Sequence, residues 1–78
     1  MRYGVSTHLA PEKVIEKAVE YFEKLGLEVT QRDEDSVCME GGGGHVTLSV
    51  CGEDKMDVDI LTEEWDQKVK EFIQRIGD

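Results

Sequence analysis

The sequence has few basic residues for its length. Nine Lys and Arg residues stand against 18 Asp and Glu residues, so the formal net charge of the 78-residue chain is −9. Nucleic acids and anionic membrane surfaces are bound through clustered Lys and Arg, so we expect neither as a partner. Aromatic residues make up 6% of the chain and apolar residues 38%, which is low but sufficient for a small folded core.

Other features are also scarce. No apolar run approaches the roughly 20 residues that cross a bilayer. Residues 1–8 lack the apolar stretch of a secretory signal, so we expect a cytoplasmic protein. The only cysteines, Cys38 and Cys51, offer no disulfide framework. A chain of 78 residues is near the lower size limit for an unassisted hydrophobic core, and residues 1–78 are expected to form a single domain.

Two segments have the apolar periodicity of amphipathic helices. The first covers residues 11–25, with Pro11 at its start and Gly26 just after its end. The second covers residues 63–76, with Thr62 as its N-cap. Its apolar stripe consists of Trp65, Val69, Phe72, Ile73 and Ile76.

Between the predicted helices the apolar period changes to two, which is typical of half-buried strands. Four strands are predicted near residues 27–30, 37–40, 45–51 and 56–60, and alternation in residues 2–7 predicts another strand before the first helix. The predicted fold class is α+β, in the order β-α-β-β-β-β-α. It combines a five-stranded antiparallel sheet with two helices packed on one face.

The hairpins can be given a register, because opposite residues of an antiparallel pair must face the same side of the sheet. Apolar residues meet when Val50 pairs with Met56, and when Met39 pairs with both Val46 and Val29. These registers need no bulge. They place the apolar side chains on one face and a strip rich in Thr, Ser and Cys on the other.

On this outer face, Glu40 lies opposite His45, and Cys38 lies opposite Thr47. Cys51 lies four residues beyond Thr47 on the same strand, a distance of about 13 Å at 3.3 Å per residue. A disulfide allows only about 7 Å between Cα atoms. We therefore predict two free thiols.

The order of elements resembles the TATA-binding-protein-like fold, a scaffold shared with the helix-grip proteins of the START-like group. The resemblance is one of topology over nearly the whole chain, and no sequence motif carries it. It implies the strand order 2-3-4-5-1, with the second helix across the concave face of the sheet. Those families bind apolar ligands between helix and sheet, or DNA on the sheet, but this chain is too acidic for the DNA role and shorter than typical ligand carriers.

The most unusual segment is a run of four glycines between two predicted strands. It can be a mobile loop that lets a ligand or partner approach the backbone, or simply a permissive hairpin tip. Trp65 either lines a pocket mouth or completes the core. The candidate ligand- or partner-binding residues are Gly41, Gly42, Gly43, Gly44, Glu40, His45 and Trp65.

Catalytic and metal sites have weaker support. Glu40 and His45 can form an acid–base pair beside Cys38, but an exposed cross-strand ion pair is the simpler interpretation. His8, His45 and the two cysteines lack the close ligand pairs of structural zinc sites, and no EF-hand pattern is present. We expect no catalytic residues, no metal and no cofactor.

Three functional hypotheses follow. The first, which we favour, is a non-catalytic interaction module that docks a protein partner, or a second copy of itself, through the outer sheet face or the glycine loop. The alternative is a small carrier of an apolar molecule between the second helix and the sheet. The third is an enzyme that uses Glu40, His45 and Cys38.

Overall fold

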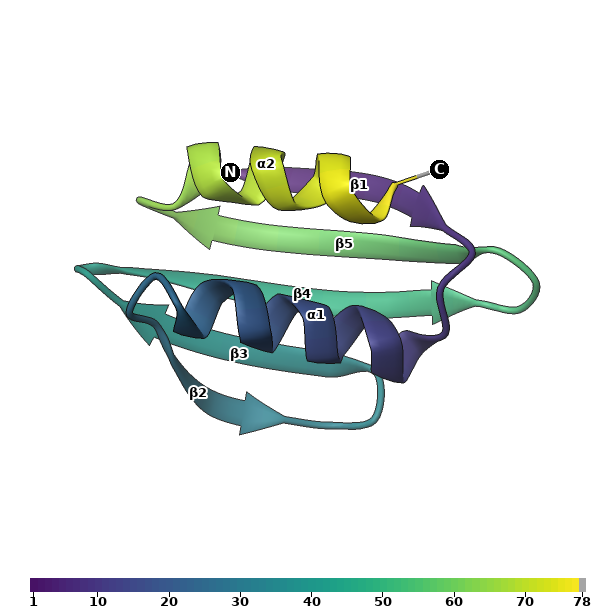
Figure 1. Ribbon diagram of the computed structural model, residues 1–78, viewed down its shortest axis with the longest axis horizontal. Helices are drawn as coiled ribbons and strands as arrows, with labels where there is room; N and C mark the ends of the chain where they lie inside the picture. The colour runs from purple at the N-terminus through teal and green to yellow at the C-terminus, as the bar shows by residue number, and fades with distance from the viewer. Residues whose placement is uncertain (78) are drawn as a thin grey trace.

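The computed structural model describes residues 1–77 and consists of two layers. A five-stranded antiparallel sheet forms one layer, and two helices cover one of its faces (Figure 1). The elements are β1 (Arg2–Thr7), α1 (Pro11–Glu23), β2 (Glu28–Arg32), β3 (Ser36–Gly41), β4 (Gly44–Gly52), β5 (Met56–Glu63) and α2 (Asp66–Ile76). The strand order is β1-β5-β4-β3-β2. The predicted fold class is confirmed, and the strand order is the one that the topological resemblance implies.

Helix α1 confirms the first helix prediction but ends at Glu23, two residues earlier than predicted. Beyond that end, Gly26 adopts a left-handed φ of 103°, which an L-residue rarely adopts. The Leu27 amide then turns back and donates to the Phe22 carbonyl oxygen at 3.1 Å. This is the hydrogen bond of a glycine-terminated helix end, and it directs the chain into β2.

The core lies between the helices and the inner face of the sheet. Its centre is aromatic, because the rings of Phe22 in α1 and Phe72 in α2 lie 5.6 Å apart between centroids. The predicted one-sided alternation is confirmed, since Val46 and Val58 are buried on the same side as Phe72. The other fully or almost fully buried apolar residues are Val14, Ile15, Ala18, Leu27, Val37, Met39, Leu48, Val50, Ile60, Val69 and Ile76.

The predicted start of the second helix is wrong. Residue 63 still belongs to β5, Glu64 takes a left-handed φ of 72°, and α2 begins only at Asp66. A left-handed residue cannot continue a helix, so the chain turns here. Thr62 is not the N-cap; it is a buried strand residue whose hydroxyl donates to the His45 carbonyl oxygen at 3.0 Å. Trp65 occupies the N-cap position without a capping side-chain bond.

The predicted pairing of Val50 with Met56 is also wrong, because Val50 pairs with Val58. Strand β5 is longer than predicted, and Gly52, with φ 138°, pairs with Met56 and closes a tighter turn. A shift of two residues keeps every side chain on its predicted face. It does change the cross-strand neighbours on the outer face.

The pairing of Val29 with Met39 is confirmed, but the expectation of bulge-free registers is wrong at β2. Thr30 is an extra residue, so Gln31 rather than Thr30 pairs with Cys38. The Thr30 hydroxyl donates to the Cys38 carbonyl oxygen at 3.2 Å. Val29 is 36% exposed, because β2 is an edge strand with all its residues exposed. Bulges are common at such sheet edges.

The space beneath α2 is filled by core side chains. Val69, Phe72 and Ile76 point from α2 into the core and are almost completely buried. The carrier hypothesis requires an apolar cavity of about 300 Å³ or more at this place.

Among the described residues, no helix has the length and apolar character needed to span a membrane.

Candidate functional site

The glycine run forms a tight turn between β3 and β4. Gly41 pairs with Gly44, and the two residues between them, Gly42 and Gly43, have φ values of 58° and 84°. Positive φ at both central positions is the geometry of the two-residue hairpin turns that favour glycine. Gly44 is constrained differently: a Cβ there would overlap the Glu63 carbonyl oxygen. Packing and turn geometry thus account for the composition of this segment.

Trp65 packs directly on this hairpin. Its indole nitrogen donates to the Gly41 carbonyl oxygen at 2.8 Å, and a Cβ at Gly42 would lie 2.7 Å from the Trp65 ring atom Cζ2. The indole ring also packs against the edge of the core and is half-buried. Trp65 therefore joins the end of the hairpin to the start of α2, rather than opening a pocket.

On the opposite side of the sheet, the hairpin end carries a row of three glutamates and one histidine. The registers place Glu28 beside Glu40, Glu40 beside His45 and His45 beside Glu63. The predicted juxtaposition of Glu40 and His45 is confirmed. We call these four residues the acidic row. Both helices lie on the other face of the sheet (Figure 1), so they do not cover it.

Next to the acidic row, the outer face is less charged. Thr47 pairs with Leu61, whereas the predicted register of Val50 with Met56 would have placed it opposite Asp59. Leu61 is 49% exposed. Arg2 forms hydrogen bonds of 2.7–3.0 Å with both carboxylate oxygens of Asp59. An open hollow of about 640 Å³ lies over Gly4, which has no side chain to fill it. The neutral residues of this strip are Gly4, Ser36, Cys38, Thr47, Ser49 and Leu61.

The catalytic hypothesis gains no geometric support. Within residues 1–77, no side-chain hydrogen bond or ion pair links Glu40, His45 and Cys38. Cys38 and Cys51 are free thiols, as predicted, with Cys38 half-buried and Cys51 exposed. In the part of the chain that the structure describes, no three His, Cys, Asp or Glu residues are grouped so that they could hold a metal ion.

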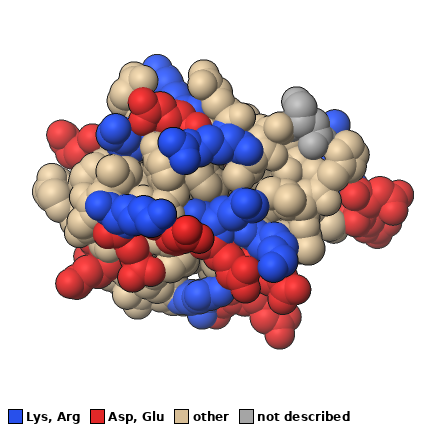
Figure 2. Space-filling view, in the orientation of Figure 1, with Lys and Arg blue, Asp and Glu red and all other residues tan. Residues whose placement is uncertain are grey.

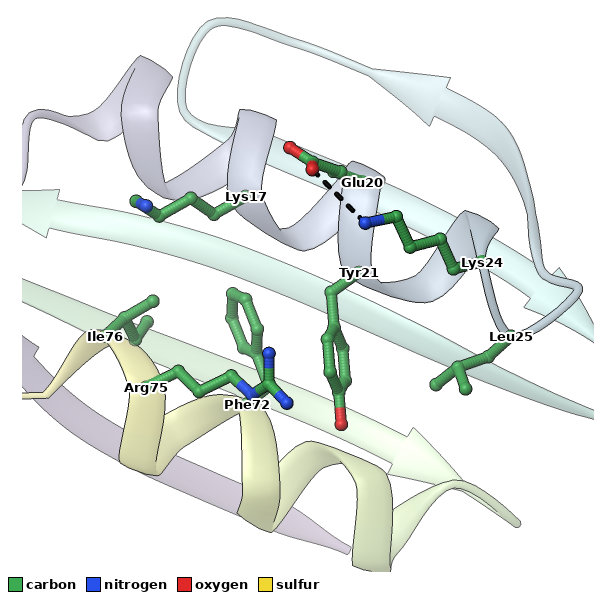
Figure 3. A pocket seen from close by; sticks show the side chains of 8 residues that line it. All are labelled: Lys17, Glu20, Tyr21, Lys24, Leu25, Phe72, Arg75 and Ile76. Atoms are coloured by element: carbon green, nitrogen blue, oxygen red, sulfur yellow. Dashed lines mark hydrogen bonds and ion pairs between the residues drawn. The ribbon is translucent and has the colours of Figure 1, made fainter.

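A groove between α1 and α2 was not identified from the sequence. Figure 3 shows Tyr21 extending from α1 and Leu25 from the turn just after it, with Phe72 and Arg75 extending from α2. The groove consists of two adjoining hollows of about 500 Å³ each, which share Tyr21, Leu25 and Arg75. Its apolar floor comprises Tyr21, Leu25, Phe72 and Ile76, and its cationic rim comprises Lys17, Lys24, Lys68 and Arg75. The sequence signal for this groove is the seven-residue spacing of Lys17 from Lys24 and of Lys68 from Arg75.

A polar network holds the centre of this inter-helix groove in place. The Tyr21 hydroxyl donates to Glu71 Oε2 at 3.2 Å, and Lys68 Nζ lies 3.3 Å from the same oxygen. The hydrogen bond from Lys68, and then that from Tyr21, lowers the pKa of Glu71. Burial, followed by the hydrogen bond to Glu71, raises the pKa of Tyr21. The Arg75 guanidinium carbon lies 5.0 Å from the centre of the Tyr21 ring, within cation–π distance.

The chain matches no protein-family model and no curated protein.

Proposed function

We propose that this protein is a non-catalytic interaction module whose outer sheet face docks a partner protein with an exposed cluster of Lys or Arg. The docking surface is the acidic row together with the neutral strip beside it. The observation that carries the proposal is the alignment of Glu28, Glu40, His45 and Glu63 across four strands.

Charge complementarity favours a basic partner. The outward-facing charged residues of the strands, His45 aside, are Arg2, Glu28, Glu40, Asp57, Asp59 and Glu63. Their formal charge is 1 − 5 = −4, and Arg2 is already bound to Asp59. A second copy of this face would repel the first, because the chain carries a net charge of −9. A second copy of this chain is therefore a less suitable docking partner than a basic protein.

The acidic row is locally unfavourable for folding, which supports a role in binding. Glu28 and Glu40 are direct cross-strand neighbours, and like charges in that position destabilise a sheet. A cation from a partner would relieve this repulsion. The neighbouring strip contributes Leu61 and the uncharged Thr47 side chain, which are easier to remove from water than carboxylates.

The glycine hairpin and Trp65 support this surface from behind. Trp65 fixes the hairpin through Gly41, and the Thr62 hydroxyl binds the carbonyl group of His45. Both contacts restrain the backbone beneath the acidic row. A surface ordered before binding loses less conformational entropy when the partner docks. In this proposal the glycine loop positions the docking residues and does not itself bind the partner.

Two broader assignments accompany this proposal. We infer that the scaffold is a short relative of the TATA-binding-protein-like and helix-grip topology, which the strand order supports. We also propose a cytoplasmic location, where the two free thiols would stay reduced. The carrier hypothesis is less favoured, because side chains fill the space beneath α2.

The test uses a labelled basic helical peptide of about fourteen residues, with Lys at seven-residue spacing beside a leucine ridge. Two such Lys residues are about 10.5 Å apart along a helix. Glu40 and Glu63 lie two strand spacings apart, or about 9.6 Å. Fluorescence anisotropy at low salt gives the affinity, which should fall as the salt concentration rises.

Replacing both carboxylates, in the double variant Glu40→Gln and Glu63→Gln, should weaken peptide binding about tenfold, since two charge contacts are lost. The matched control is Glu16→Gln with Glu23→Gln, on exposed positions of α1, which changes the net charge equally. The control should bind like the wild type. Equal weakening in both double variants would show that only the overall charge attracts the peptide, and the proposal would be rejected.

A further inference from the structure

The inter-helix groove reverses the sign of charge that dominates the rest of the protein. The charged residues lining its two hollows are Lys17, Glu20, Lys24, Lys68, Glu71 and Arg75. Their formal charge is 4 − 2 = +2, in a chain of net charge −9. Figure 2, which views the helical face, shows Lys and Arg side chains across its middle with Asp and Glu around them. This local excess of cations favours an anionic occupant.

The two acidic residues of the groove already have partners. Glu20 Oε1 lies 3.4 Å from Lys24 Nζ, and the Glu71 carboxylate binds both Lys68 and the Tyr21 hydroxyl. In contrast, neither Lys17 nor Arg75 forms an ion pair with a carboxylate within residues 1–77. Arg75 instead lies over the Tyr21 ring (Figure 3). These two cations, one from each helix, are therefore open to carboxylates from outside the chain.

The spacing of the cations identifies the shape of the occupant. Lys17 in α1 and Lys24 at the C-cap of that helix are seven residues apart, and so are Lys68 and Arg75 in α2. Seven residues of helix span about 10.5 Å. A single small anion cannot reach both ends of such a groove. A helix lying along it can place carboxylates seven residues apart against each rim and an apolar ridge against Tyr21 and Leu25.

We propose that the inter-helix groove docks an acidic amphipathic helix of a partner protein. The partner helix would lie between α1 and α2, on the side away from the sheet. Its apolar side chains would contact the Tyr21 ring and Leu25, and its Asp or Glu residues would pair with Lys17 and Arg75. Helix-in-groove recognition of this kind uses anchors on successive turns of one helix face. The site is separate from the outer sheet face, so it goes beyond the function proposed above.

The test uses a helical peptide of about fourteen residues with a leucine ridge and Glu at seven-residue spacing on both flanks. A control peptide has Gln in place of every Glu. Binding is measured by fluorescence anisotropy, and the contacted residues are identified from amide shifts. The acidic peptide should shift the amides of residues 17–25 and 68–76, and the Gln peptide should bind at least about tenfold more weakly.

Matched variants separate the groove from the overall charge. The double variant Lys17→Gln and Arg75→Gln should weaken binding of the acidic peptide about tenfold. The control double variant, Lys13→Gln and Lys70→Gln, removes one cation from each helix outside the groove and should bind like the wild type. Thermal unfolding of all variants verifies that they remain folded. If one does not, Lys17→Met with Arg75→Met, which keeps an apolar stem at both positions, replaces the groove variant.

Equal weakening by the groove and control variants would overturn the proposal, and so would amide shifts outside the groove. Tighter binding of a single-stranded oligonucleotide or an anionic lipid vesicle, with the same amide shifts, would also overturn it in favour of a phosphate ligand. A negative result here leaves the basic-peptide test unaffected, because that test probes the opposite face with a probe of opposite charge.

Discussion

Replacing Gly42 with alanine should destabilise the protein more than the same substitution one residue later, at Gly43. Both glycines have positive φ, 58° and 84° respectively, so both alanine variants force an L-residue into the left-handed region. That conformation costs roughly 1–2 kcal/mol per residue. The two positions differ in their surroundings. A Cβ at Gly42 would lie 2.7 Å from the Trp65 ring, whereas nothing lies within 4 Å of a Cβ at Gly43.

The expected difference follows from this contact. Gly43→Ala should reduce the free energy of unfolding by about 1–2 kcal/mol. Gly42→Ala adds the cost of overpacking, roughly 1–3 kcal/mol, and displaces the indole that donates to the Gly41 carbonyl oxygen. A domain of this size loses about 4–8 °C in melting temperature per kcal/mol. The two variants should therefore differ clearly in thermal stability.

Urea unfolding provides the assay, because Trp65 is the only tryptophan in the chain and its fluorescence reports on the hairpin contact. Circular dichroism measured on the same samples checks that unfolding remains two-state. The native fluorescence of Gly43→Ala should match that of the wild type, and that of Gly42→Ala should be shifted. Equal losses of stability with unchanged fluorescence in both variants would refute the assigned contact between Trp65 and the glycine turn.

Three further predictions concern other contacts. Thr62→Val removes a buried hydroxyl that donates to a main-chain carbonyl of β4, so the free energy of unfolding in urea should fall by about 0.5–1.5 kcal/mol. An unchanged free energy of unfolding would contradict this hydrogen bond. The hydrogen bonds from Arg2 lower the pKa of Asp59 from its ordinary value of 3.8, so the ionised carboxylate stabilises the fold above that pH and this contribution disappears as the pH falls. Asp59→Asn should thus unfold at lower urea than the wild type near neutral pH, with the difference closing as the pH falls below 3.8, whereas a constant difference would contradict this pairing. Cys51 is exposed and Cys38 half-buried, so a thiol reagent followed by mass spectrometry should label Cys51 first, and mild oxidation should yield no intramolecular disulfide.

Alternation of apolar residues was sufficient to predict the sheet, its two faces and its free cysteines. The same reasoning could not detect the register of β4 and β5, because a shift of two residues leaves every side chain on the same face. The apolar pairs Leu48 with Ile60 and Val50 with Val58 satisfy the pattern as well as the predicted pairs do. The correct choice depends on the tight turn at Gly52, which the pattern does not encode.

The second helix shows a different limit of sequence reasoning. Glu63 and Glu64 suit the first turn of a helix by charge, but tertiary pairing keeps Glu63 in β5, opposite His45. The inter-helix groove was missed for a related reason. Cations such as Lys17 and Arg75 look like ordinary exposed residues on each helix until the fold places the helices side by side. Contacts between distant segments decide both features.

The central claim is that the acidic row and the neutral strip form the docking surface, and amide-shift mapping with the basic peptide tests it most directly. If this surface docks the partner, the largest shifts lie on the outer face, at Glu40, His45, Thr47, Leu61 and Glu63, with α1 and α2 almost unchanged. Shifts concentrated on the helices, or spread evenly over the molecule, would contradict it.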